Sequence, residues 1–286
     1  MISKPVDSEP LRQLDGILPD DEVHVWQVDL VAWEKEADSL LELLDPPEQA
    51  QAARFKFAEP RNQFVISRAL LRRTLGRYLQ IEAREVRFRT TANGKPELAL
   101  NRDRQSNDRQ SNDRQSNDRQ SNGRQANDRQ ASDLRFNLSH TKGMTVIAIV
   151  RRRQVGVDVE RIRADTNAVE LAERFFSPQE VEWLQSQPAD QHIPSFFSCW
   201  TAKEAYIKAH GDGLSLPLSS FGVLPRPTAS ELQLQVYADP EESRRWSMWR
   251  LELGPTLRAA LAVEGQNCRV RLGQWPSHEM DANSPA

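Results

Sequence analysis

The elements predicted from this sequence occur in the same order twice, and this doubling limits the fold more than any other feature. Each series runs strand, helices, strands; the first begins near Val23 and the second near Val155. Two such series favour an α+β protein of two similar halves, related by pseudo-two-fold symmetry. We expect halves at 1–152 and 153–275 that meet near a hairpin turn at 151–154. A pocket at that junction would take residues from both halves.

Local patterns place the individual elements. In the first half, alternating residues predict strands at 23–30, 86–90 and 145–150, and apolar spacing predicts helices at 46–54 and 60–79. In the second half, the patterns predict a strand at 155–160, helices at 168–176, 178–187 and 193–209, and strands at 232–237, 247–253, 257–263 and 268–272.

A pentapeptide repeat interrupts the first half at about 101–133. Asn-Asp-Arg-Gln-Ser recurs from Asn107, Asn112 and Asn117 and then drifts. A period of five fits neither a strand nor a helix face, and the segment has no aliphatic residue larger than alanine, so it cannot offset the entropy of ordering. We expect a disordered, solvated insertion rather than an interaction tail, and a disordered C-terminal tail at 276–286.

Composition excludes several classes of function. The net charge of −3 gives no argument for binding nucleic acid or a membrane. The longest apolar run, 144–150, is too short to span a bilayer, and no secretory signal is visible at the N-terminus. Cys199 and Cys268 form neither a metal-binding spacing nor a disulfide framework, which favours a reducing compartment. We therefore expect a cytoplasmic protein.

Two acidic clusters carry the chemistry. In the strand at 155–160, Gly156, Asp158 and Glu160 share one face, which places the two carboxylates about 7 Å apart at the backbone. Like charges so placed are unfavourable without a cation. In the helix at 193–209, Glu204 and Lys208 lie one turn apart. Three carboxylates with lysines beside them would suit a hard divalent cation bound to phosphate.

Each of these features also has a simpler interpretation. Asp158 and Glu160 could be solvent-facing acids on an edge strand. Glu204 and Lys208 could be a surface pair worth about 0.3–0.5 kcal/mol. The rest of their helix is apolar, however, so a charged stripe on it needs a partner. Considered alone, His140 is more typical of a structural histidine and Lys95 of an exposed turn lysine.

Together these motifs resemble those of the Sfp-type 4′-phosphopantetheinyl transferases. The family pattern Gly-(Ile/Val)-Asp-x-Glu matches 156–160, and Trp-x-x-Lys-Glu-(Ala/Ser)-x-x-Lys matches 200–208. Further similar segments are 94–96, 137–140, 174–177 and 211–215. Five or more motifs in the same order make the resemblance specific, and it covers about 54–221 apart from the insertion.

The resemblance implies a reaction and a metal site. A monomeric enzyme would transfer 4′-phosphopantetheine from coenzyme A to a serine of an apo acyl or peptidyl carrier protein, leaving holo carrier and 3′,5′-ADP. Asp158, Glu160 and Glu204 would bind Mg²⁺ against the pyrophosphate. Glu204 would also take the serine proton, directly or through water. Lys208 would neutralise the pyrophosphate as charge develops on the leaving group, supported by Lys203.

The resemblance also implies a coenzyme A site, to which it assigns Lys95, Pro96, Ser139, His140, Arg54 and Lys208. His140 would contact the 3′-phosphate. In the stretch that precedes the helix at 60–79, the family often has basic residues that reach the 3′-phosphate. Glu48 and Gln51 stand there in this chain, so Arg54 is the nearest basic candidate for that contact.

Two alternatives remain open. A metal-dependent phosphodiesterase or pyrophosphatase could use the same carboxylates, but it would need a water-activating base that the five scattered histidines do not supply. A catalytically silent module that binds carrier proteins could keep the fold, but the metal ligands and Lys208 are all present. The pathway that the carrier serves cannot be inferred from the sequence.

Overall fold

The computed structural model describes residues 18–91, 93–99, 133–211, 216–225 and 230–276. The predicted insertion, the predicted tail and the loop at 212–215 lie outside these ranges, apart from Asp133 and Pro276 at their borders.

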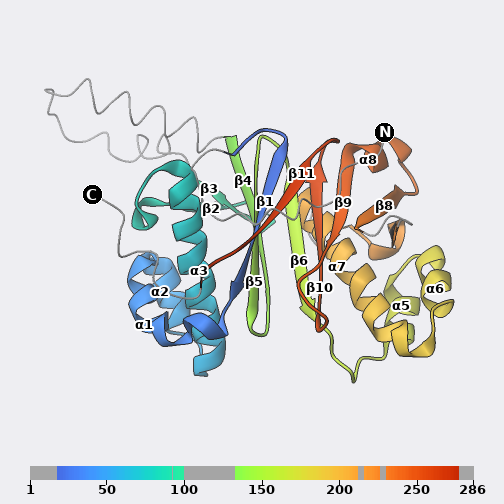
Figure 1. The fold of residues 1–286 in the computed structure, drawn as a ribbon, viewed down its shortest axis with the longest axis horizontal. Coiled ribbons are helices and arrows are strands. Elements are labelled where there is room, and N and C mark those ends of the chain that lie inside the picture. Colours follow the sequence, from blue (N-terminus) through green and yellow to red (C-terminus); the bar gives the residue numbers. More distant parts are fainter. Residues whose placement is uncertain (1–17, 92, 100–132, 212–215, 226–229, 277–286) are drawn as a thin grey trace, which may run out of the picture.

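Two β-sheets form the centre of the molecule (Figure 1). The first sheet has the order β11 (Arg269–Gln274), β1 (Glu22–Asp29), β5 (Met144–Arg151) and β4 (Leu134–Thr141). The second has the order β6 (Val155–Arg161), β10 (Leu257–Glu264), β9 (Trp246–Leu251), β8 (Glu231–Val236) and β7 (Phe221–Pro225). A small ladder joins β2 (Phe88–Thr90) to β3 (Pro96–Leu98). Neighbouring strands are antiparallel except β1 and β11, which are parallel.

Helices cover the outer face of each sheet, which gives four layers (Figure 1). On the first sheet lie α1 (Ala37–Leu40), α2 (Pro46–Ala52) and α3 (Ala58–Leu79). On the second lies α7 (His192–His210), flanked by α5 (Ala168–Phe175) and α6 (Pro178–Gln185), with the short α8 (Pro240–Arg245) between β8 and β9. The α+β class is therefore confirmed. None of the helices in the described part of the chain is long and apolar enough to cross a membrane.

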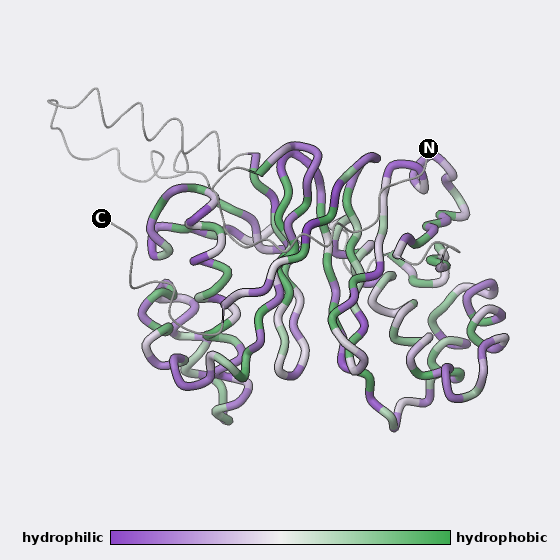
Figure 2. Tube along the Cα trace, in the orientation of Figure 1, coloured by the Kyte–Doolittle hydropathy of each residue, from purple (hydrophilic) through white to green (hydrophobic). Residues whose placement is uncertain are grey.

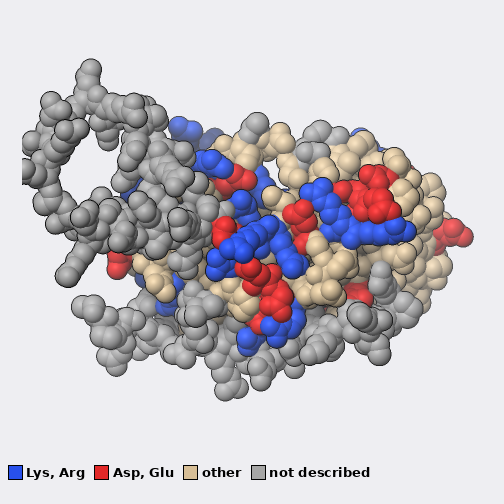
Figure 3. Space-filling view, turned by 90° about the horizontal axis from the view of Figure 1, so that it is seen from above, with Lys and Arg blue, Asp and Glu red and all other residues tan. Residues whose placement is uncertain are grey.

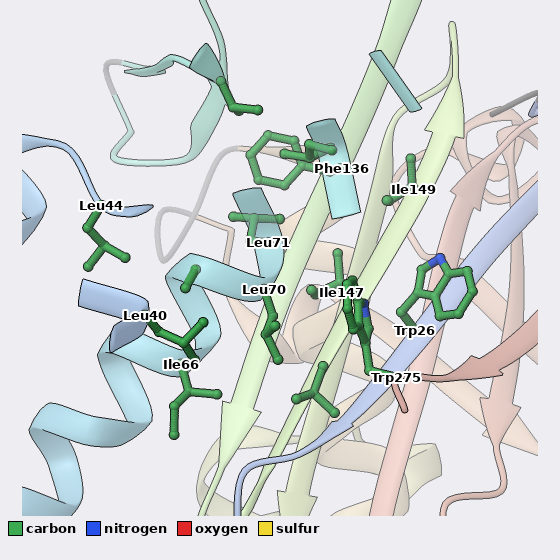
Figure 4. Close-up of a cluster of buried hydrophobic side chains, with 14 of the residues drawn as sticks. Trp26, Leu40, Leu44, Ile66, Leu70, Leu71, Phe136, Ile147, Ile149 and Trp275 are labelled. Carbon is green, nitrogen blue, oxygen red and sulfur yellow. The ribbon is translucent and has the colours of Figure 1, made fainter. Parts of the chain in front are cut away.

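Buried apolar side chains form a cluster in each of the three spaces between these layers. Figure 2 shows that the strands at the centre carry many hydrophobic residues. Between α3 and the first sheet, Leu70, Leu71, Ile147 and Trp275 belong to one cluster (Figure 4). Between the two sheets, the inward residues include valines of β1, β5 and β6 and apolar residues of β9 and β10. The valines of β6 are buried there, so the intervening Gly156, Asp158 and Glu160 face α7 instead, as the strand alternation requires.

The structure differs from the sequence-based expectations at two places. The strand predicted at 268–272 pairs with β1 of the first sheet, and Trp275 joins the first core, so the end of the chain returns to the first half. The segment 151–154 does not close a hairpin, because β5 and β6 belong to different sheets. It is the crossing point between the halves. Among the described helices and strands, α1, β3, β4, β7 and α8 have no counterpart among the predicted elements.

A ladder of side chains joins the two sheets where β4 and β6 lie side by side. Asn137 Oδ1 accepts from Val157 N at 2.9 Å, and Ser139 Oγ accepts from Val159 N at 3.3 Å. Thr141 Oγ1 accepts from Arg161 N at 3.1 Å. Side chains of one strand thus bind backbone amides of the next, in place of a backbone ladder. We call this arrangement the side-chain ladder.

Charges of both signs are interleaved on the face seen from above in Figure 3. The arginines at the crossing point likewise lie next to acidic residues. Arg151 and Arg152 each form ion pairs with Asp20 and with Asp133. The same two acids, Asp20 and Asp133, therefore hold both arginines.

Candidate active site

The two acidic clusters meet because α7 packs directly on β6. Gly156 is the residue that permits this contact: a Cβ at its position would lie 2.1 Å from Ala205 O and 2.3 Å from Ala209 N. No side chain fits in that space, so the glycine of the strand motif is required by packing. The close approach brings the last turns of α7 over the carboxylates of β6.

Asp158 is the centre of the site. It is 4% exposed. Its Oδ1 accepts from Lys208 Nζ at 2.6 Å and from Ser139 Oγ at 2.7 Å. Its Oδ2 is also buried and has no hydrogen-bond partner among the described residues. A buried carboxylate oxygen without a partner is costly, and such an oxygen needs a ligand to satisfy it.

Glu160 and Glu204 complete the acidic group. Burial raises the pKa of Glu204, and the charges of Asp158 and then Glu160 raise it further against the opposing effect of Lys208. Burial likewise raises the pKa of Glu160, again with the charge of Asp158 as the next cause. The three predicted metal ligands therefore lie close enough to repel one another. A cation among them would remove that repulsion.

The arrangement fits a cation that takes only part of its ligands from protein. Among the described residues, no three or more His, Cys, Asp or Glu side chains are arranged so that they could hold a metal ion as they stand. Mg²⁺ keeps several waters and is usually bound by one or two carboxylates together with substrate phosphates. The unpartnered Oδ2 of Asp158, beside two further carboxylates, suits that kind of site.

Lys203, for which the resemblance implies a supporting role, lies outside this group. Its side chain is fully buried and donates to Glu180 Oε2 at 2.6 Å and to Phe221 O at 2.6 Å. Its ammonium also lies 4.3 Å from the centre of the Phe221 ring. Successive residues of a helix point about 100° apart, so Lys203 faces α6 while Glu204 faces β6. The structure therefore places Lys203 in a folding contact, which joins α7 to α6 and β7.

Ser139 and His140 approach the site from β4 of the first half. Ser139 Oγ donates to Asp158, accepts from Val159 N, and lies 3.0 Å from Lys208 Nζ. Ser139 thus orients the central carboxylate. His140 keeps exposed surface, yet desolvation lowers the pKa of its imidazole, and the charge of Lys208 lowers it further. Both residues belong to the predicted coenzyme A set, and both lie at the acidic group.

Lys95 contacts the second half from the turn before β3, of which Pro96 is the first residue. Lys95 Nζ donates to Lys208 O at 2.7 Å and to Val155 O at 3.3 Å. Burial lowers the pKa of Lys95 to about 8. The predicted nucleotide turn therefore lies against the site, but its lysine amine binds backbone carbonyls of the second half.

Arg54 is exposed in the turn that follows α2. The acid that precedes it, Glu48, has a folding role: it forms ion pairs with Arg68 at 2.6 Å and Arg72 at 2.7 Å, and it closes the N-terminus of α2 with Asp45. The departure from the family pattern at Glu48 thus serves the packing of α2 on α3.

Four residues of this region were not among the predicted site residues: Asn93, Asn137, Thr141 and Glu180. The sequence contains a signal that could have identified Asn137 and Thr141. Asn137, Ser139 and Thr141 occupy alternate positions of β4 and so share one face, which is unusually polar for an inner face of a sheet and indicates polar contacts there. Glu180 carried a capping-box signal with Ser177, but nothing in the sequence pointed to Lys203 as its partner.

Comparisons with known proteins agree with this geometry. A family model described as the 4′-phosphopantetheinyl transferase superfamily matches residues 154–263, and one for the N-terminal part of 4′-phosphopantetheinyl transferase matches 30–118. The chain is 35% identical over 245 residues to the 4′-phosphopantetheinyl transferase HetI of Nostoc, covering 86% of this chain and 89% of that protein.

Two further relatives have the same description. A putative 4′-phosphopantetheinyl transferase of Synechocystis is 28% identical over 84% of this chain and 82% of its own length. The transferase Sfp of Bacillus subtilis is 27% identical over 66% of this chain and 70% of its own length. With two family models and a relative of this identity and coverage, the chain belongs to the 4′-phosphopantetheinyl transferase superfamily.

Proposed function

We propose that this protein transfers the 4′-phosphopantetheine of coenzyme A to a serine of an apo carrier protein, with Mg²⁺ as cofactor. One observation supports the metal most directly: the buried Oδ2 of Asp158 lacks a hydrogen-bond partner in the described structure, while Lys208 and Ser139 bind its Oδ1. Membership of the superfamily supports the group that is transferred.

Asp158, Glu160 and Glu204 would hold the Mg²⁺. A bound Mg²⁺ would neutralise charge on the pyrophosphate and help to align it. The chain's own residues supply the rest. Lys208, held at Asp158, is placed to neutralise the charge that develops on the leaving 3′,5′-ADP. Ser139 holds the Asp158 carboxylate so that one oxygen remains available.

The bond changes follow from the substrates. The serine oxygen of the carrier forms a bond to the phosphorus that carries the pantetheine arm, and the bond from this phosphorus to the oxygen of 3′,5′-ADP breaks. The serine proton passes to Glu204, directly or through a water molecule. The raised pKa of Glu204 favours that role, because a base with a pKa nearer to the working pH accepts a proton more readily.

The coenzyme A nucleotide would lie against the first half. His140, beside Lys208, is the candidate for its 3′-phosphate, and Pro96 with the backbone of the Lys95 turn would line the adenosine. Arg54 is a further basic candidate from the exposed turn after α2. We also propose a cytoplasmic monomer; both cysteines are free, which suits a reducing compartment.

The proposed function is tested by measuring the transfer of phosphopantetheine directly. The protein is incubated with coenzyme A, Mg²⁺ and each of several purified apo carrier proteins, and the carriers are weighed by mass spectrometry. We expect a gain of one phosphopantetheine on the serine of at least one acyl or peptidyl carrier. A folded protein that modifies no carrier but hydrolyses coenzyme A or pyrophosphate would instead support the phosphodiesterase reading. Binding of carriers without either reaction would support the silent module.

A further inference from the structure

One turn of the first half contacts three carbonyl groups of the second half, two at the C-terminal end of α7 and one at the start of β6. Asn93 Nδ2 donates to Gly211 O at 2.8 Å. Lys95 Nζ donates to Lys208 O at 2.7 Å and to Val155 O at 3.3 Å. The turn itself is fixed, because Lys95 N donates to Thr91 Oγ1 and Thr91 N donates to Lys95 O. A rigid turn therefore supplies donors across the seam between the halves.

The end of a helix needs such donors. The last four carbonyl groups of an α-helix have no partner within the helix. Helix α7 ends at Gly211, which has a φ of 93° and whose N–H binds Ile207 O. The carbonyls of Lys208 and Gly211 point beyond that turn, where an ammonium is also favoured by the helix dipole. Asn93 and Lys95 donate the hydrogen bonds that the helix itself cannot supply to these carbonyls.

Lys95 binds the helix and the strand beneath it at the same time. Val155 is the first residue of β6, and Lys208 lies in the last turn of α7. Between them the backbones touch at Gly156, with no room for a Cβ. The amine of Lys95 therefore fixes the separation of the two elements that carry Asp158 and Lys208. Lys208 Nζ lies 2.6 Å from Asp158 Oδ1, a distance that a small shift of α7 would lose.

We propose that Lys95, assisted by Asn93, is a positioning residue that holds the last turn of α7 on β6 and thereby keeps Lys208 at Asp158. This rests on the proposed function, since it gives Lys95 a role in the transfer step. It differs from the nucleotide contact that the family resemblance implies for the same side chain. The nucleotide is then served by the backbone of the turn and by Pro96, while the amine connects the first half to the catalytic lysine.

The first measurement does not depend on activity. Amide hydrogen exchange is followed in residues 204–211 of the wild type, Lys95→Met, Asn93→Ala and Lys142→Met. Lys142 is the matched control, because it is an exposed lysine that pairs with Glu59 on the surface. We expect faster exchange in this segment for Lys95→Met, a smaller change for Asn93→Ala and none for Lys142→Met. Unchanged exchange in Lys95→Met overturns the proposal.

The second measurement separates positioning from nucleotide contact. We expect Lys95→Met to lower kcat for transfer by about 10- to 100-fold, the range typical of groups that orient a reacting group. Binding of adenosine 3′-monophosphate, measured by calorimetry, should change by less than about threefold, because this ligand has the adenosine and the 3′-phosphate but lacks the pyrophosphate that Lys208 meets. A loss of affinity for adenosine 3′-monophosphate as large as the loss of kcat would assign Lys95 to the nucleotide and overturn the proposal.

A double-mutant cycle completes the test. If Lys95 acts through Lys208, then Lys95→Met should have little further effect in a Lys208→Ala background. Equal effects in both backgrounds would contradict the proposal. Should Lys95→Met fail to fold, Asn93→Ala takes its place in each measurement. Inactivity of the wild type and of Lys142→Met alike would count against the proposed function, and the exchange data would still decide the positioning role.

Discussion

Two lysines of α7 meet two acids, and the two pairs are built differently. Lys203 and Glu180 are both completely buried, and their contacts are complete: Glu180 also accepts from Ser177 and from Val223 N. Lys208 and Asp158 are 29% and 6% exposed at the side chain. One oxygen of Asp158 is left without a partner among the described residues.

The difference separates stability from activity. A buried pair with every hydrogen bond made holds elements together and offers nothing to a ligand. The Asp158 cluster gathers three acids against one lysine, so it is electrostatically incomplete. Such incompleteness is tolerated at sites where a ligand completes it. The comparison predicts that changes to the two pairs affect different properties of the protein.

The largest effect should follow from Asp158→Asn. This change keeps the shape of the side chain but removes the charge that would hold the cation. We expect transfer to fall by roughly 10²–10⁴-fold, since a metal ion contributes several kcal/mol to the transition state. The melting temperature should not fall, because repulsion with Glu160 and Glu204 is relieved. Transfer assays and thermal unfolding measure the two properties; near-normal activity would remove Asp158 from the mechanism.

The next effect concerns Glu180. In Glu180→Gln, the buried Lys203 ammonium loses its counter-charge, and breaking a buried pair in this way costs about 3–5 kcal/mol of unfolding free energy. Activity per folded molecule should stay within a few-fold of wild type. The double variant Glu180→Gln with Lys203→Met should be more stable than Glu180→Gln alone and should still transfer. A double variant that folds but is inactive would restore the catalytic role predicted for Lys203.

The smallest expected effects are on how the stability of the fold depends on pH and on bound Mg²⁺. The raised pKa values of Glu160 and Glu204 mean that the folded protein binds protons there more readily than the unfolded chain. Their contribution to stability is fully present below the ordinary pKa of glutamate and is lost as pH rises through the raised values. At pH values above the raised pKa values, we expect Mg²⁺ to bind these carboxylates in place of the protons.

We therefore expect Mg²⁺ to raise the melting temperature by a few degrees at pH 8, and by progressively less as the pH falls toward the raised values. In metal-free protein, Glu204→Gln should itself raise the melting temperature slightly at pH 8 and remove most of the Mg²⁺ response. Ca²⁺-free buffers without added Mg²⁺ serve as the baseline. A Mg²⁺ response that is independent of pH would contradict the assignment of these carboxylates.

Most of the elements could be predicted, because their signals are local. Helix α7 is apolar on nearly every side and ends at a glycine, and β6 alternates valine with small or acidic residues. Most elements that escaped prediction are short: β7 contains Gly222 and ends at Pro225, and α8 is a polar helix of 6 residues. Glycine, proline and polar residues obscure the periodicity on which such predictions depend.

Pairing between distant segments could not be predicted in the same way. Nothing local in 268–272 indicates that this strand joins β1, at the opposite end of the chain. The site shows the same limit. Asp158, Glu160, Glu204 and Lys208 could be predicted as neighbours from their residue types and spacing. The partner of Lys203 and the contacts of Lys95 instead depend on how α6 and the first half pack against α7.

The side-chain ladder between β4 and β6 also bears on the protein's behaviour in solution at high concentration. Both strands stand at the edge of a sheet, and an exposed edge is a template on which another chain can add a strand. Here the outward amides of Val157, Val159 and Arg161 already have acceptors from the neighbouring strand. The two edges thus shield each other from edge-to-edge aggregation, while the space between them stays wide enough for side chains rather than for a continuous sheet.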